Sequence, residues 1–300
     1  ASDPARADPF HRFPEGTMNK PAHMKGKTCL ITGSTSGHGL AVAEALHGMG
    51  ADIILHGPTP EACQSVSGRF PSLAGTVACD FSSRREIERG AREVLSLKRP
   101  IHVLVNNAGM VSRRRALSAD GVEMTFAVNY LAMFQFTLLV LPGLIGAAPS
   151  RIVNVGSDAH VLSSLDPDDI DGSGKSYSAM GAYGRSKLGV AYFTEELARR
   201  LDGTGVTVNA VDPGPMATDI AKKPGLLPRI ADAIMQLTFP TPARAARTAI
   251  HLASSPEVEG VSGKYFRFMK MKEPKLKSGT DFHGRLWEIS ASMTGADYRG

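Results

Sequence analysis

The sequence has few cysteines and few aromatic residues, and it lacks a long hydrophobic run. Its three cysteines, Cys29, Cys63 and Cys79, have no metal-ligand spacing and form no even-numbered disulfide framework. We therefore expect no metal site, and buried thiols in a reducing compartment. No apolar run reaches about 18 residues and no signal peptide is recognisable. We expect a cytoplasmic protein without a membrane span.

A strong charge of one sign is also missing. The net charge is +5, with 34 basic and 29 acidic residues, and the hydrophobic share of 42% is typical of a soluble globular protein. The basic runs "RRR" at 113–115 and "KMKEPKLK" near the C-terminus have no interleaved aromatic residues and match no nucleic-acid motif. We interpret both runs as solvated surface and expect no nucleic-acid partner.

From Lys27 onward, short apolar runs alternate with helix-length segments. The runs are "KTCLITG", "ADIILHG", "GTVACD", "IHVLVNNAG", "SRIVNVGS", "GVTVNAVDPG" and "GKYFRF", and the helical segments include 84–97, 121–146, 180–201 and 242–254. Strands that are apolar throughout indicate a parallel sheet covered on both faces. The predicted fold is α/β, a single-domain Rossmann-type doubly wound parallel sheet of about seven strands with helices on both faces.

The domain boundaries follow from composition. Residues 1–24 show no periodicity and are interpreted as a tag remnant or a disordered N-terminal arm. Residues 25–292 form the predicted dinucleotide-binding domain, with a substrate loop at 215–241, and 293–300 form a C-terminal tail. Ligands bind beyond the carboxyl ends of the strands in such sheets, which favours the Gly- and Pro-rich loops as binding segments.

Two motifs carry candidate chemistry. Tyr183 and Lys187 are four residues apart and would share a helix face, where the ammonium favours the phenolate. This spacing also occurs on many solvated helices, so it needs support elsewhere. The turn "TGSTSGHG" follows the first strand and opens a helix, a context that favours a dinucleotide diphosphate at the helix N-terminus. The residues of this turn assigned to cofactor binding are Gly33, Ser34, Ser36, Gly37, His38 and Gly39.

Six motifs, in order and spacing, resemble the short-chain dehydrogenase/reductase family. They are the T-G-x-x-x-G-x-G turn, "NNAG" at 106–109, the Asn of "AVNYL", the Ser of "NVGS", "YGRSK" at 183–187 and "DPG" at 212–214. Two further segments, "FTEELARRLDGTGVTVNAVDPGPMATD" and "RLWEIS", resemble its retinol dehydrogenase-like branch. The resemblance covers about residues 26–292. It implies an NAD(P)-dependent oxidoreductase that interconverts a carbonyl and a primary or secondary alcohol on a lipophilic or aromatic small molecule.

The resemblance also implies residue roles. Tyr183 is the general acid/base, Lys187 lowers its pKa and holds the nicotinamide ribose, Ser157 polarises the substrate carbonyl, and Asn129 holds a water in the proton relay. Elementary chemistry agrees, because hydride addition to a carbonyl builds an alkoxide that needs hydrogen-bond donors and a proton. The remaining cofactor contacts implied are Asp80 and Phe81 beside the adenine, Asn107, Ala108 and Gly109 along the cofactor, and Pro213, Gly214, Met216 and Thr218 over the nicotinamide.

The chain departs from the family pattern at several positions. His38 stands where an aliphatic residue is usual. It either touches the diphosphate or caps and packs the first turn of the helix. After the second strand, an acid would indicate NAD and an arginine NADP, but the chain has His56, Gly57, Pro58 and Thr59. The missing carboxylate favours NADP over NAD, with His56, Thr59 and Ser34 as phosphate donors. The N-terminal apolar anchor common in the retinol branch is not visible, which puts retinoid or microsomal function in doubt.

Substrate, assembly and alternative functions are less defined. An apolar pocket could be lined by Met110, Val111, His160, Met180, Met216, Ile220, Ile234 and Met235, each of which could equally be core. A homodimer or a homotetramer is expected. Two alternatives stay open, a nucleotide-sugar epimerase or dehydratase and a non-catalytic dinucleotide-binding regulator.

Overall fold

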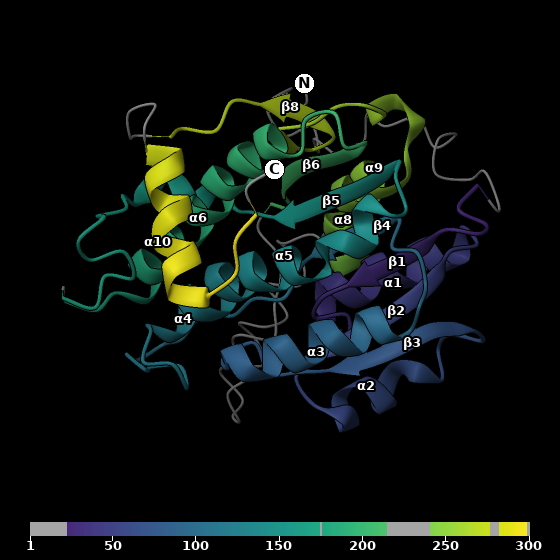
Figure 1. Cartoon of the computed structure of the whole chain (residues 1–300), viewed down its shortest axis with the longest axis horizontal. Helices are drawn as coiled ribbons and strands as arrows, with labels where there is room; N and C mark the ends of the chain where they lie inside the picture. The colour runs from purple at the N-terminus through teal and green to yellow at the C-terminus, as the bar shows by residue number, and fades with distance from the viewer. Residues whose placement is uncertain (1–22, 175, 215–240, 277–281, 299–300) are drawn as a thin grey trace, which may run out of the picture.

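The computed structural model describes residues 23–174, 176–214, 241–276 and 282–298. Its centre is one eight-stranded sheet in the order β3-β2-β1-β4-β5-β6-β7-β8 (Figure 1). Neighbouring strands are parallel except for the β7–β8 pair. The strands are β1 (Thr28–Ile31), β2 (Asp52–Gly57), β3 (Leu73–Ala78), β4 (Val103–Asn106), β5 (Ser150–Val155), β6 (Val206–Asp212), β7 (Lys264–Arg267) and β8 (Lys270–Lys272).

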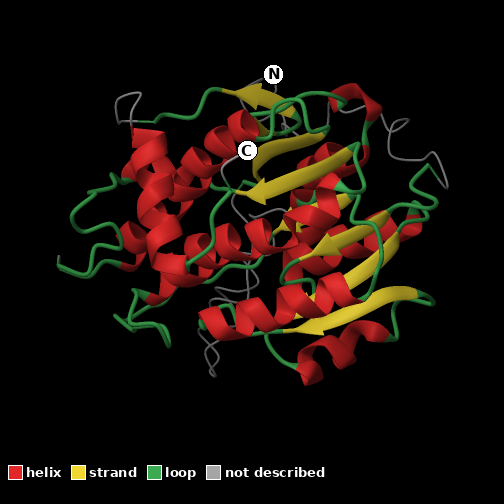
Figure 2. Ribbon diagram, viewed as in Figure 1, coloured by secondary structure: helices red, strands yellow, loops and turns green. Residues whose placement is uncertain are grey.

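Helices cover both faces of the sheet, as predicted (Figure 2). One face packs against α3 (Arg84–Ser96), α5 (Ala132–Ile145), α6 (Ala179–Arg200) and α10 (Phe282–Thr294). The other packs against α1 (Gly37–Gly48), α2 (Pro60–Ser67) and α9 (Arg247–Ser254), near the short α8 (Pro242–Ala245). Alternate residues of a strand supply the two cores: Leu30 belongs to the first, and Cys29 and Ile31 to the second.

The seven strands predicted from the apolar runs are all present, and β8 is an addition. β8 is three residues long, "KMK", and lacks the apolar pattern of the others. It follows a tight turn in which Phe268 and Met269 have φ of 51° and 58°. Local sequence gives no strand signal here; the pairing with β7 creates the strand.

The helical segment predicted at 121–146 is interrupted. It comprises α4 (Met124–Phe126), a π-helical turn (Ala127–Leu131) and α5. The run Met124–Ile145 is long and apolar enough to cross a membrane, but 72% of its most apolar window is buried inside the protein. A core helix passes the same test, and this helix lies against the sheet.

Candidate active site

The predicted catalytic residues meet at the carboxyl ends of β4, β5 and β6. Ser178 caps the N-terminus of α6, and its hydroxyl accepts from the Gly181 N–H at 3.2 Å. The Lys187 Nζ lies 5.6 Å from the centroid of the Tyr183 ring and donates to the Val155 carbonyl at 2.7 Å. The last residues of β5 thus hold the ammonium beside the phenol.

Ser157 follows β5 and faces the same phenol. Burial raises the pKa of Tyr183, a hydrogen bond with Ser157 lowers it, and the charge of Asp212 raises it. Burial lowers the pKa of Lys187 to about 8. The expectation of a lowered tyrosine pKa is not met here, because burial outweighs the favourable contacts of the phenol.

Asn129 lies in the π-helical turn, a feature often found at functional sites. Its Oδ1 accepts from Met110 N at 2.7 Å, and its Nδ2 donates to the Met110 carbonyl and, at 3.1 Å, to Ser186 Oγ. Ser186 in turn donates to the Tyr183 carbonyl. The amide is therefore tied to α6 beside the tyrosine–lysine pair.

The glycine turn has the geometry that a diphosphate requires. A Cβ at Gly39 would lie 2.3 Å from both Asn107 Nδ2 and the Gly33 carbonyl, and one at Gly33 would lie 2.9 Å from Ala108 Cα. Gly37 opens α1 with φ of 53°. Ser36 begins this helix without a side-chain capping bond, so backbone N–H groups stay available to an anion. The residues present fit a dinucleotide.

His38 is buried beside this turn. Asn107 donates from Nδ2 to the carbonyls of Thr32 and Gly33, so its Oδ1 must accept from His38 Nδ1 at 2.8 Å. The His38 Nε2 is buried and has no hydrogen-bond partner among the described residues. Burial lowers the pKa of His38, which keeps the ring neutral. Because Nδ1 carries the proton, Nε2 of the neutral ring can only accept a hydrogen bond, so His38 offers no donor to a diphosphate and its burial agrees with packing of the first helix turn.

His56 and Ser34 have roles inside the protein that differ from the predicted phosphate contacts. His56 accepts from the Gly33 N–H at 3.0 Å, and its Nε2 lies 3.2 Å from Cys79 Sγ. Burial lowers the pKa of His56 to about 4. The Ser34 hydroxyl is occupied by the His56 backbone. Both ring nitrogens are engaged, so His56 braces the turn and has no free donor for a phosphate.

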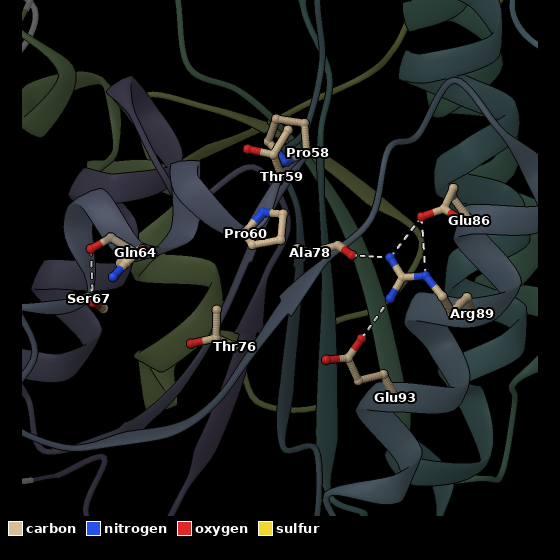
Figure 3. Close-up of a pocket in the computed structure, with 10 residues that line it drawn as sticks. All are labelled: Pro58, Thr59, Pro60, Gln64, Ser67, Thr76, Ala78, Glu86, Arg89 and Glu93. Atoms are coloured by element: carbon tan, nitrogen blue, oxygen red, sulfur yellow. Dashed lines mark hydrogen bonds and ion pairs between the residues drawn. The ribbon is translucent and has the colours of Figure 1, made fainter.

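Thr59, the other predicted donor, lines a hollow of about 660 Å³ at the edge of β3 (Figure 3). Its hydroxyl caps α2 by accepting from Ala62 N at 3.2 Å. Across the hollow, Arg89 contacts the Ala78 carbonyl and is paired with Glu86 and Glu93. An arginine is therefore near the end of β3, but two carboxylates already neutralise it.

The other predicted contacts are placed as follows. Asp80 is exposed after β3 and accepts a hydrogen bond from Ser82 N. Phe81 is buried, and its ring centroid lies 4.4 Å from that of His56. Gly109 is exposed, and a Cβ there would lie 3.2 Å from Asn129 Oδ1. Gly214 donates to Asp212 Oδ1 at 2.9 Å, directly after the buried Pro213. Met216, Thr218, Ile220, Ile234 and Met235 lie outside the described residues.

Some further features bear on the predictions. The three cysteines are free and buried, as expected. Within the part of the chain that the structure describes, no group of His, Cys, Asp and Glu could hold a metal ion. His160 is buried and bonds through Nδ1 to the Ser157 carbonyl at 2.8 Å. Sequence reasoning missed the ion pairs of Asp158 and Asp212 with Arg267, because no local motif signals them.

Comparisons with known proteins agree with this geometry. The family model for short chain dehydrogenase matches residues 27–225. Human retinol dehydrogenase 14 is 38% identical over 92% of this chain and 88% of its own length. Mouse polyprenol dehydrogenase is 35% identical over 90% of this chain and 84% of its own length.

Solved structures extend the likeness. An uncharacterized protein from Mycobacterium Paratuberculosis superposes with a TM-score of 0.77 at 25% identity, over 94% of this chain and 98% of its own. The Pseudomonas aeruginosa RhlG/NADP active-site complex superposes with a TM-score of 0.66 at 26% identity, over 82% and 96%. The chain therefore belongs to the short-chain dehydrogenase/reductase family, in its retinol dehydrogenase-like branch, and is an NAD(P)-dependent oxidoreductase.

Proposed function

We propose that the protein interconverts a carbonyl and a primary or secondary alcohol on a lipophilic small molecule, with Tyr183 as general acid/base. The observation that carries this proposal is the convergence of Ser157, Tyr183 and Lys187 at one strand edge. The bound nicotinamide supplies the hydride chemistry. Ser157 holds the substrate oxygen, and Tyr183 gives that oxygen its proton in reduction or removes it in oxidation.

Lys187 keeps a positive charge beside the phenol. This charge favours the phenolate when the proton moves, and the remaining N–H groups of the ammonium suit a nicotinamide ribose. Asn129 keeps its position through Met110 and Ser186, so its carbonyl oxygen has capacity for a relay water. These roles are proposals that the contacts support.

The lipophilic character of the substrate rests on exposed apolar side chains. Met110, Leu162 and Met180 are 37%, 73% and 55% exposed, and they belong to the three segments that carry the site. Met110 contacts Asn129 through its backbone, Leu162 ends the helical turn after Ser157, and Met180 lies one turn before Tyr183 on α6. Large apolar side chains around polar catalytic groups suit a hydrophobic alcohol or carbonyl. Two relatives are named retinol dehydrogenase and polyprenol dehydrogenase, which supports the same class.

We further propose NADP as the preferred cofactor, a cytoplasmic location and a homodimer or homotetramer. The preference rests on the missing carboxylate after β2, and the NADP complex of RhlG is a structural relative. Selectivity should be modest, because no guanidinium follows β2 to form a bidentate phosphate contact.

A panel of aliphatic, aromatic and isoprenoid ketones, aldehydes and alcohols tests the proposal. Turnover is followed by the reduced-nicotinamide absorbance with NADPH, NADH and their oxidised forms. We expect turnover of apolar members that rises with chain length and a moderate preference for the phosphorylated cofactor. Turnover confined to nucleotide sugars would support the epimerase or dehydratase alternative, and cofactor binding without turnover would support a regulator.

A further inference from the structure

Four charged side chains form a cluster beside the tyrosine–lysine pair. We name Asp158, Asp212, Arg267 and Lys272 the hairpin charge cluster, because β7 and β8 carry its two basic members. Lys272 Nζ lies 2.8 Å from both Asp158 oxygens. Arg267 also contacts Asp158, and its Nε lies 3.2 Å from Asp212 Oδ2. The β7–β8 hairpin thus binds the loop that follows β5 and the last residue of β6.

The cluster adjoins the backbone that holds the catalytic ammonium. Lys187 donates to the carbonyl of Val155, which pairs in register with Val211. Asp212 is the next residue and ends β6. Its negative charge raises the pKa of both Tyr183 and Lys187. This carboxylate therefore opposes the ionisation of the phenol that the reaction needs.

Arg267 counteracts that carboxylate. Asp212 is 3% exposed, and a buried carboxylate requires a partner because its desolvation is costly. Burial raises the pKa of Asp212, whereas the guanidinium of Arg267 lowers it. Without the guanidinium, the carboxylate would face the catalytic pair with the Gly214 N–H to offset its charge and with the like charge of Asp158 nearby.

We propose that Arg267 is a positioning residue for the oxidoreductase reaction, and that by pairing with Asp212 it sets the pH range in which Tyr183 transfers its proton. This inference rests on the proposed role of Tyr183. It assigns a task to Arg267 and to Asp212, the first residue of the "DPG" motif, neither of which has another proposed role.

Three further polar groups come from the elements packed around the site. Ser157 comes from the loop after β5, His160 from the following helical turn, and Tyr265 from β7, with its ring 5.3 Å from that of His160. Burial raises the pKa of Tyr265, so this phenol stays neutral. Asp158 and Lys272 pair with each other. The charges beside Tyr183 are therefore those of Lys187, Asp212 and Arg267, together with that of Asp158, which contacts Arg267 and raises the pKa of Asp212.

The test uses two substitutions with opposite expected effects on the pH profile of alcohol oxidation. Asp212→Asn keeps an acceptor for the Gly214 N–H but removes the negative charge, so the profile should move to lower pH by about one unit. Arg267→Met leaves Asp212 uncompensated and should move the profile to higher pH by about one unit. The double variant should return toward the parent, because neither charge is present.

Further variants separate charge from structure. Arg267→Lys keeps the positive charge and should keep the parental profile. Lys272→Met should shift the profile less than Arg267→Met does, because Lys272 pairs with Asp158 rather than Asp212. If both Asp212→Asn and Arg267→Met shift the profile in the same direction, or if neither shifts the profile or the ionisation of the Tyr183 phenol, the proposal is wrong. Where Arg267→Met does not fold, Arg267→Gln takes its place with the same expected sign.

A spectroscopic readout distinguishes this inference from the proposed function. The carbon-13 signal of the tyrosine Cζ reports phenol ionisation in the holoenzyme, and Tyr183→Phe assigns it. Opposite shifts of this titration with unchanged pH–rate profiles would uphold the charge cluster and reject Tyr183 as the acid/base. A titration that neither variant moves would reject the role of Arg267, whatever the activity.

Discussion

The buried polar groups at the two ends of the sheet are of different kinds. Around β1, β2 and β3 they are neutral: His56 accepts from the Gly33 N–H, contacts Cys79 and has a pKa lowered to about 4. Around β6, β7 and β8 they include charged, paired groups beside neutral ones such as Asn209, as in the contact of Arg267 with Asp212. The sheet thus supports the glycine turn with neutral hydrogen bonds and the catalytic residues with paired ions.

This difference fits what each end has to hold. A dinucleotide diphosphate is stabilised by backbone N–H groups and would be repelled by a buried carboxylate, so neutral support suits the glycine turn. Proton transfer at Tyr183 depends on the surrounding charges, so that edge needs charges in fixed positions. Substitutions at one end or the other test this difference.

The largest effect is expected from Tyr183→Phe. The ring still packs but the proton donor is gone, so the turnover number should fall by about 10²- to 10⁴-fold while cofactor affinity stays nearly unchanged. Steady-state rates and cofactor titration by fluorescence measure both. Tyr192→Phe on the same helix is the control, since Tyr192 is buried against Phe282 and His283. Parental turnover in Tyr183→Phe would contradict the assignment.

A pH effect on stability should come from His56. Its pKa is about 4 in the folded protein, against an ordinary value of 6.5 for histidine. Below pH 6.5 the unfolded chain therefore binds a proton that the folded chain does not bind. Stability is therefore lost as the pH falls from 6.5 toward 4, by about 3 kcal/mol. His56→Asn can still accept from the Gly33 N–H, and it should flatten this loss.

Urea unfolding at pH 7, 6, 5 and 4 measures the effect of His56→Asn on the free energy of unfolding. His47→Asn, which alters a partly exposed histidine on α1, is the matched control and should follow the parental curve. Identical acid dependence in the parent and His56→Asn would show that the ring takes up a proton in the folded state.

Gly39→Ala should weaken both the fold and cofactor binding. The added Cβ would lie 2.3 Å from the Gly33 carbonyl, so the turn must move, at a cost of about 1–3 kcal/mol. Gly48→Ala is the control, because nothing lies within 4 Å of a Cβ there. Thermal unfolding with and without NADPH compares the two, and a loss of cofactor-induced stabilisation is expected in Gly39→Ala alone.

The smallest effect concerns cofactor choice at Pro58. The parent should prefer NADPH over NADH by one or two factors of ten, or about 1.4–2.8 kcal/mol. Pro58→Arg should strengthen this preference, because Glu86 and Glu93 already neutralise Arg89 across the hollow. Pro58→Asp should turn it toward NADH. Specificity constants for both cofactors decide the matter, and a parent that prefers NADH by more than tenfold would contradict our interpretation of the missing acid.

The sequence predicted what depends on local pattern. Seven apolar runs became strands, the glycine turn opens α1, and Tyr183 and Lys187 share a face of α6. Among the described residues, helices α2 and α10 were not predicted, although Thr59 and Pro60 form a recognisable helix start before α2. β8 was not predicted either, because its residues have no strand pattern of their own.

The sequence by itself determined the order of strands and helices, the positions of the glycines and the tyrosine–lysine spacing, because period and spacing are properties of neighbouring residues. Tertiary structure decided which side chains are free. It engaged both ring nitrogens of His56 with Gly33 and Cys79, and it brought Arg267 to Asp212 by placing β7 beside β6. Such contacts join residues far apart in the chain, and the order of strands in the sheet, which no local pattern encodes, makes them neighbours.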